Sequence, residues 1–396
     1  MRWSSAISDL SDLPNAVTAA ATEALAGLDG APPDLAVVFV SAHHRPNFEA
    51  VPWLLKPLLG EALLLGCTAG GVIGGGREVE QRPGFSITLA SLPGVELNPF
   101  TITNEQLPNQ DAPPDAWHAL VGATPDRDPQ FVLLSDPFTT NIDDLVVGLD
   151  YAFPKAVKVG GLASAAGRPG VNTLYLGGQT VKQGAVGVAL TGNITVDTVV
   201  AQGCRPIGQP MQITACERNV LTGLDGRPPL EVLQDLYARA NDHDQTLFQG
   251  SLFLGIVMDE LQGEYRMGDF LIRNLMGAER ETGALYIGAM LRENQTVQFH
   301  LRDAGAASDD LRNMLSTYLS EHDPAQAEGA LLFSCLGRGV GLYGVPDHDT
   351  DLFREFVGPL PLGGFFCNGE IGQVGGGTYV HGYTSSFGIF RPARRD

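Results

Sequence analysis

The sequence is poor in basic residues. It carries 25 Lys and Arg against 45 Asp and Glu over 396 residues, which gives a formal net charge of -20. Nucleic acids and anionic membrane surfaces are bound through basic patches, so this balance argues against both as partners. The charge names no other partner, because a strong negative charge also serves solubility alone.

Long apolar runs are also missing. The most apolar stretch, VPWLLKPLLGEALLLG (51–66), is interrupted by Lys56, Pro57 and Glu61, so it is too short and too broken to cross a bilayer. The N-terminal MRWSSAISDLSDLPNAV lacks the continuous apolar core of a signal peptide. We therefore expect a cytoplasmic protein without membrane insertion.

Cysteines are few and widely spaced, with no CxxC pair. This excludes a zinc ribbon or a thioredoxin-type motif and fits a reducing compartment. The five are Cys67, Cys204, Cys216, Cys335 and Cys367.

Nucleotide and metal motifs are missing as well. The sequence has no Walker A motif and no GxGxxG between a strand and a helix, and its histidines lack metal-ligand spacing. The acidic stretches DHDTD (347–351) and NDHD (241–244) lack the glycine-spaced calcium loop, so they are interpreted as solvated loops.

One supersecondary pattern recurs three times. An apolar strand ends in Ser, Ser-Asp or Ser-Cys, a helix follows, and a second apolar strand runs into a glycine loop. The copies begin at LAVVFVS (35–41), FVLLSD (131–136) and ALLFSC (330–335). Their two strands are separated by roughly 25–30 residues, which favours a repeated unit, although any βαβ unit has about this length.

Several further elements are predicted from spacing. Helices are expected at 13–28, 48–59, 231–240 and 308–322, the last with Ser308 as its N-cap. Residues 174–192 fit a hairpin, and successive short strands between 252 and 302 form an antiparallel meander.

The sequence therefore predicts an α+β fold of two pseudo-similar domains. It would have layered mixed and antiparallel β-sheets with helices packed on the outside. The turn-rich segment Gly223–Pro229 is the best boundary and gives domains of residues 30–225 and 226–391.

Several of these stretches resemble the FIST family, including its N-terminal and C-terminal domains, over residues 35–391. The matching stretches include LGCTAGGVIGGG, VGGLASA, LDGRPPLEVL, ALLFSCLGRG, LPLGGFFCNGEIG and VHGYTSSFGIFR. The resemblance implies a sensory signal-transduction module that binds a small molecule, an amino acid or a related polar metabolite. With no room for an output segment, we expect a stand-alone module that signals through a partner protein in trans.

The densest group of candidate ligand-binding residues lies between 329 and 391. Arg338, in CLGRG, could hold a carboxylate with its guanidinium fork, or could be a surface arginine. Glu370, in CNGEIG, could hold a ligand amine or form a structural pair with Arg338 or Arg273. Arg273 lies in an apolar strand, where its charge is paired, functional or on the solvated face. The full predicted set is Arg273, Ser334, Cys335, Arg338, Gly364, Phe365, Asn368, Glu370 and His381.

Two other function classes stay open. A cysteine-dependent amide hydrolase would need Cys335 or Cys367 near His381, but buried cysteine is usually a small core residue. A haem-based nitric oxide sensor, which the resemblance also allows, would need an axial ligand such as His44, His300 or His381. The expectation is a protein that is not an enzyme and has no cofactor or metal, with haem as the alternative.

Overall fold

The computed structural model describes residues 1–109 and 111–393. The chain forms two compact units, one from residues 1–200, 312–380 and 384 onward, the other from residues 201–311 and 381–383. Mixed sheets in the first unit and an antiparallel barrel in the second confirm the predicted α+β class. The predicted division near residue 225 stays a prediction. Within the described ranges, no helix combines the length and apolar character needed to cross a membrane.

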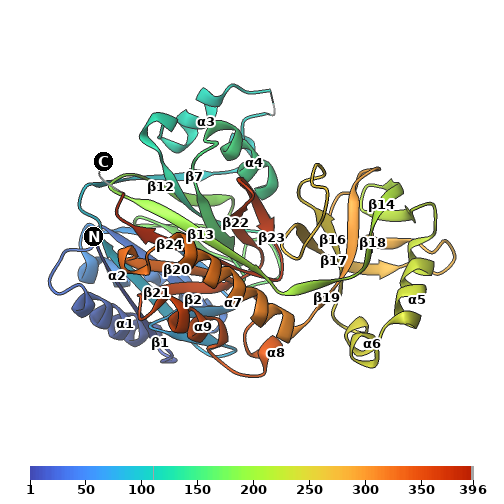
Figure 1. Cartoon of the computed structure of the whole chain (residues 1–396). Coiled ribbons are helices and arrows are strands. Elements are labelled where there is room, and N and C mark those ends of the chain that lie inside the picture. Colours follow the sequence, from blue (N-terminus) through green and yellow to red (C-terminus); the bar gives the residue numbers. More distant parts are fainter. Residues whose placement is uncertain (110, 394–396) are drawn as a thin grey trace. The chain divides into compact units, whose positions relative to one another are not determined.

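The first unit contains three six-stranded sheets of the same design (Figure 1). In each, a parallel pair lies at the centre, with antiparallel strands on both sides. The first sheet runs β1 (Arg2–Ser8), β6 (Phe85–Ser91), β2 (Leu35–Ser41), β3 (Leu63–Ala69), β10 (Leu174–Leu176) and β11 (Gln179–Val181). The second runs β7 (Val95–Ile102), β12 (Ala185–Gly192), β8 (Gln130–Ser135), β9 (Lys158–Leu162), β22 (Glu370–Val374) and β23 (Gly377–His381). The third runs β13 (Thr195–Gln202), β24 (Thr384–Arg391), β20 (Gly329–Cys335), β21 (Leu362–Cys367), β4 (Gly71–Gly74) and β5 (Arg77–Glu80).

The three parallel pairs β2–β3, β8–β9 and β20–β21 confirm the predicted repeat. One glycine in each second strand shows which residues of the three repeats are equivalent. A Cβ at Gly66, Gly160 or Gly364 would fall 2.2, 1.8 or 1.9 Å from the carbonyl oxygen of its partner on the first strand. Only glycine allows this close approach. By this alignment Ser41, Asp136 and Cys335 occupy equivalent positions at the ends of the first strands.

The hairpin that follows each second strand joins a different sheet. The β4–β5 hairpin follows β3 but pairs with β21, and β10–β11 follows β9 but pairs with β3. The β22–β23 hairpin follows β21 and pairs with β9. The three repeats are therefore interlocked in a cycle, and each contributes two strands to its neighbour's sheet.

A ring of hydrogen bonds links the ends of the three second strands. The N–H of Ser164 donates to the carbonyl of Thr68, and the N–H of Asn368 donates to that of Leu162. The third connection is indirect. The Gly70 N–H donates to the hydroxyl of Ser164 (2.9 Å), which itself donates to the Phe366 carbonyl.

Apolar side chains from all three sheets form one central core, among them Phe39, Val132 and Phe365. Helices α1 (Leu13–Gly27) and α2 (Val51–Leu59) pack against the sheet that contains β2 (Figure 1). Helix α1 is capped by Asp12, which accepts from the Asn15 N–H, and buries one alanine-rich face. Helices α3 (Pro114–Val121) and α4 (Ile142–Ala152) pack over the sheet that contains β8. The other helices of this unit include α8 (Val340–Tyr343) and α9 (His348–Val357).

The second unit contains a closed six-stranded barrel. Its interior holds apolar side chains such as Leu254, Val297 and Phe299. The strands, in barrel order, are β14 (Cys204–Glu217), β15 (Val220–Leu224), β18 (Leu285–Ile287), β17 (Phe270–Ala278), β16 (Leu252–Val257) and β19 (Thr296–Arg302). The predicted antiparallel meander is confirmed for β16, β17 and β18 but not for β19, which pairs with β16 and β14. Helices α5 (Pro229–Arg239) and α6 (Asp242–Phe248) belong to the same unit.

Three element predictions are wrong in detail. The hairpin over 174–192 is only β10–β11, because β12 leaves it to pair with β7 and β8. Helix α7 (Ala304–Glu321) begins before Ser308, so Ser308 is not its N-cap. The predicted helix over 48–59 is a 3₁₀ segment, Ala42–Ala50, that continues into α2.

Candidate functional site

Arg338 lies in the turn between β20 and α8, and its side chain is 0% exposed. The alternative of a surface arginine is therefore wrong. Its guanidinium forms a fork with the carboxylate of Asp349, with Nε 2.9 Å from Oδ2 and Nη2 3.0 Å from Oδ1. A second bond from Nη2 reaches the hydroxyl of Tyr343. This bidentate geometry is the strongest form of Arg–carboxylate contact, and burial strengthens it further.

Asp349 lies in the first turn of α9 and is also buried. The prediction of a solvated loop at 347–351 is wrong for this residue. The hydroxyls of Ser334 (3.2 Å) and Ser385 both donate to its Oδ2. Burial opposes ionisation, but the charge of Arg338 and the surrounding hydrogen bonds hold the pKa of Asp349 well below its usual range.

Two carboxylates reach this cluster from another repeat. Glu78 lies on β5, in the hairpin that the first repeat contributes to the third sheet, and accepts from the Thr350 N–H through Oε1 (2.9 Å). Glu80 accepts from the Val340 N–H through Oε1 (2.9 Å). Burial first, and then the charge of Asp349, raises the pKa of Glu78 to about 8. The β4–β5 hairpin of the first repeat therefore completes the site of the third.

Glu370 begins β22 and is fully buried. Its Oε2 accepts from the N–H (3.1 Å) and the hydroxyl (2.8 Å) of Thr384. Burial raises its pKa to about 8, against the lowering effect of the Thr384 hydrogen bonds and the Arg338 charge. Each of the three hairpins pairs with the sheet of another repeat, and they can be aligned by their partner residues. In this alignment Val72 of the first hairpin and Leu174 of the second occupy the position of Glu370 in the third. An acidic side chain at this position is thus specific to the third repeat.

Three polar atoms on these residues lack a hydrogen-bond partner although they are buried. They are Nη1 of Arg338, Oε1 of Glu370 and Oε2 of Glu78. Buried polar atoms in proteins are nearly always paired, so each such atom marks a place for a water molecule or a ligand group. The cluster offers one donor from a cation and acceptors from two carboxyl groups. This combination suits a ligand that carries both an acceptor and a donor.

Cys335 and Cys367 are paired in register at the ends of the parallel strands β20 and β21. Cys367 is fully buried, and burial raises the pKa of its thiol well above the usual value. Cys335 is 9% exposed and accepts a hydrogen bond from the Gly337 N–H at 3.4 Å. The hydrolase alternative stays a prediction.

The remaining predicted residues near these strands have different surroundings. Ser334 joins the cluster through Asp349. Gly364 and Phe365 lie in β21, where Gly364 allows the close approach of Leu332 and Phe365 stacks on Phe39 with ring centroids 4.5 Å apart. Both therefore have a packing role. Asn368 is exposed in the turn before β22.

Two predicted residues belong to the second unit. Arg273 lies in β17 and donates from Nη1 to the Ile272 carbonyl (3.1 Å). His381 is buried at the end of β23. Their part in ligand binding stays a prediction.

The two other haem candidates are buried histidines whose Nε2 atoms lack a hydrogen-bond partner, His44 and His300. Nδ1 of His300 lies 3.0 Å from the Gln298 carbonyl, and burial lowers the pKa of His300 to about 4. A neutral imidazole of this kind could ligate iron. However, its ring lies 4.8 Å from that of Phe270, and a Cβ at Gly255 would fall 2.5 Å from it. His300 is thus enclosed by packed core, which does not fit a haem.

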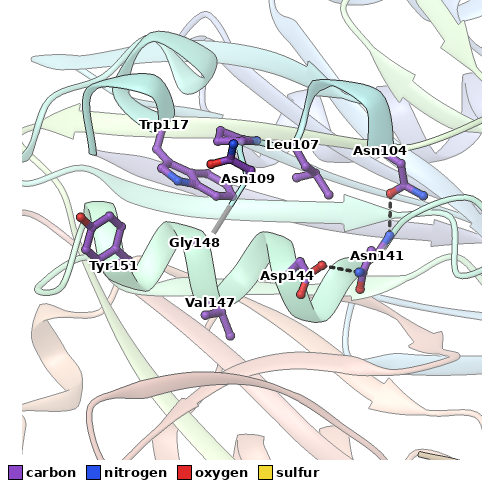
Figure 2. A pocket seen from close by; sticks show the side chains of 10 residues that line it. Asn104, Leu107, Asn109, Trp117, Asn141, Asp144, Val147, Gly148 and Tyr151 are labelled. Carbon is purple, nitrogen blue, oxygen red and sulfur yellow. Dashed lines mark hydrogen bonds between the residues drawn. The ribbon is translucent and has the colours of Figure 1, made fainter. Parts of the chain in front are cut away.

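A pocket in the first unit lies elsewhere, between α3, α4 and the segment 104–109 (Figure 2). Its volume is about 750 Å³, and Trp117, Val147 and Tyr151 are among its lining residues. None of the predicted site residues lines it. This pocket was not predicted from the sequence, because its walls come from segments without a recognised motif.

Sequence reasoning also missed Asp349 and Glu78. Asp349 carried a readable signal, because Leu352 and Phe353 follow at helical spacing and all three share a buried face. No local signal identified Glu78, whose partner Thr350 is 272 residues away.

Comparison with known proteins gives matches over nearly the whole chain. The FIST N domain matches residues 34–227, and the FIST C domain matches residues 229–373. An uncharacterised protein of Mycobacterium tuberculosis is 36% identical over 98% of this chain and 100% of its own length. An uncharacterised protein of Mycobacterium bovis is 35% identical over 96% of each chain. An F-box/LRR-repeat protein of Arabidopsis thaliana is 26% identical over 41% of this chain and 31% of its own. A solved cyanuric acid hydrolase from A. caulinodans aligns over 99% of this chain and 100% of its own, at 10% identity and a TM-score of 0.34.

Proposed function

We propose that this chain, which belongs to the FIST family of sensory, ligand-binding domains, binds a small zwitterionic metabolite such as an amino acid. The ligand carboxylate would accept from Nη1 of Arg338. Its ammonium group would donate to Oε1 of Glu370. The observation that carries the proposal is this pair of buried, unpaired atoms of opposite hydrogen-bonding character in one cluster.

The fixed geometry of Arg338 supports this role. Asp349 and Tyr343 hold Nε and Nη2, so the guanidinium plane is oriented before a ligand arrives. Preorganised groups lose less conformational entropy on binding, and a guanidinium matches a carboxylate closely. Burial limits the ligand to a small one and requires the turn after β20 to open for entry. That opening would change the surface that a signalling partner meets.

A thermal-shift screen of the twenty amino acids, with matched amines and carboxylic acids, tests the proposal. Binding to the native state alone stabilises the fold by mass action, by about 2.7 kcal/mol at 100 times the Kd, and this raises the melting temperature. We expect stabilisation only by compounds that carry both groups. Glu370→Gln, which keeps the volume, should weaken binding by about tenfold through loss of one charged contact. Equal shifts with simple carboxylic acids, or shifts unchanged in Glu370→Gln, would count against the site.

A further inference from the structure

The pocket between α4 and the segment 104–109 is separate from the Arg338 cluster in its residues and in its chemistry. Its volume of about 750 Å³ is within the range of small-molecule sites. Its walls are mostly apolar, and Leu107, Trp117, Val147 and Tyr151 contribute to them. A mostly apolar wall with a few polar groups is the usual composition of a ligand pocket.

One face of α4 forms a side of this pocket. Asp144, Val147, Gly148 and Tyr151 follow the spacing i, i+3, i+4 and i+7, so they share a face of the helix (Figure 2). Val147 is 64% exposed and Tyr151 is 58% exposed. Apolar side chains exposed together on one face mark a surface that another molecule covers.

The indole of Trp117 lies directly on this helix. A Cβ at Gly148 would fall 2.0 Å from the ring, so glycine is required for this contact. The contact buries the indole, which is only 4% exposed, so Trp117 forms part of the pocket wall beside Gly148 and between Tyr151 and Asp144 along the helix (Figure 2).

Hydrogen bonds connect the segment 104–109 to the start of α4. Oδ1 of Asn104 accepts from the Asn141 N–H at 2.7 Å, and Nδ2 of Asn141 donates to Oδ2 of Asp144 (Figure 2). A capping box between Thr103 and Gln106 fixes the turn that carries Asn104. The pocket is therefore formed before any ligand binds.

The only charged side chain that lines the pocket within the described residues is Asp144. One of its oxygens is bonded to Asn141, which holds the carboxylate in place. Asp144 lies four residues before Gly148, so the backbone positions of Asp144 and of the Trp117 contact are about 6 Å apart along the helix axis. That distance suits a ligand with a ring and an amine two or three bonds away.

We propose that this pocket binds a flat aromatic amine, which goes beyond the proposed function of the Arg338 cluster. The ring would lie against the exposed side chains of Val147 and Tyr151, and Trp117 would complete the wall. The ammonium group would pair with Asp144, and aromatic faces near a cation add a further attraction. An aromatic carboxylate of the same size would meet Asp144 as a like charge, so the pocket would reject it.

Calorimetric titration of the full chain with phenethylamine and with phenylacetate tests this inference. We expect phenethylamine to bind at least tenfold more tightly. In Asp144→Asn this ratio should fall to near one. The matched control is Asp143→Asn, since Asp143 is exposed in the same helical turn but does not line the pocket. It should leave the ratio unchanged.

The control matters because a net charge of -20 attracts any cation. Equal losses in the Asp143 and Asp144 variants would assign the preference to general electrostatics and overturn the proposal. Failure of wild-type protein to bind phenethylamine at millimolar concentration would overturn it as well. Tyr151→Ala, at an exposed position, provides a second variant that should fold and bind phenethylamine several-fold more weakly.

Discussion

Glu78 accepts a hydrogen bond from the backbone N–H of Thr350 at 2.9 Å, and this contact joins two repeats of the chain. Glu78 lies on a hairpin that follows the first βαβ unit, whereas Thr350 lies in the first turn of the helix of the third. The site at the end of β20 is therefore built by hairpin exchange. Its stability and its chemistry depend on residues from both repeats.

Loss of the Asp349 carboxylate should be strongly destabilising. Asp349→Asn leaves the guanidinium of Arg338 buried without a counter-charge, and breaking a buried pair from one side costs about 3–5 kcal/mol. Chemical denaturation measures this directly. The matched control is Asp351→Asn, because Asp351 is exposed on the same helix and should change the free energy of unfolding by less than about 0.5 kcal/mol. Similar losses in both variants would contradict the buried-pair description.

The titration of Glu370 should make the fold less stable as pH rises from about 4.5 to about 8. Glu370 keeps its proton up to about pH 8 in the folded state, but its ordinary pKa is 4.5. Between these values the folded state binds more protons than the unfolded state, so rising pH favours unfolding. Glu370→Gln removes this titration and should flatten the slope by about 1.4 kcal/mol per pH unit.

Urea unfolding at several pH values between 5 and 8.5 provides the measurement. Glu78, whose pKa is also raised to about 8, should continue to titrate in the Glu370→Gln variant and leave a remaining slope of the same sign. An identical slope in wild type and variant would show that Glu370 is ionised in the folded state.

Ser164→Ala should open the ring of hydrogen bonds that links the three second strands. The substitution leaves the Gly70 N–H and the Phe366 carbonyl without their shared partner, at a cost of about 1–3 kcal/mol. Ser86→Ala is a suitable control, because Ser86 is buried and its hydroxyl has no partner. Thermal unfolding of both variants distinguishes the two serines. Equal melting temperatures would mean that the ring contributes nothing measurable.

Gly364→Ala should disrupt the third parallel pair. The new Cβ would fall 1.9 Å from the Leu332 carbonyl oxygen, and the backbone around β21 cannot move without shifting the exchanged β4 strand. We expect a loss of at least about 3 kcal/mol, or failure to fold. A Cβ at Gly375 would meet open space, so the left-handed φ of +59° is the only source of strain there. Gly375→Ala should therefore lower the free energy of unfolding by about 1–2 kcal/mol. Comparable stabilities of the two variants would disprove the proposed reason for glycine at 364.

The sequence predicted those features that depend on local pattern. Apolar runs such as LAVVFVS and their helical connections identified the three βαβ units, because both faces of a central parallel strand are buried. Arg338 and Glu370 stood out because both are charged residues among glycines and apolar strands. The structure brings these two residues into one cluster.

The remaining features depend on contacts between distant segments. Each hairpin pairs with the sheet edge of another repeat rather than with that of its own. A hairpin has the same sequence signature in either sheet, so the sequence does not show which edge it joins. Asp349 was misread because its acidic neighbours suggested solvent, although its helical spacing to Phe353 indicated burial. Strand β1 lacks clear alternation, so its position at the edge of the first sheet was not predicted.

The most direct test of the proposed ligand site is the number of protons released on binding. An ammonium group beside Glu370 favours the ionised carboxylate, so binding near pH 7 should release a proton from a group whose pKa is about 8. Titration calorimetry of the best-stabilising amino acid in two buffers with different ionisation enthalpies measures this number. We expect release approaching one proton for the wild type and close to zero for Glu370→Gln. Equal release from both proteins, or binding without any proton release, would contradict a ligand amine at Glu370.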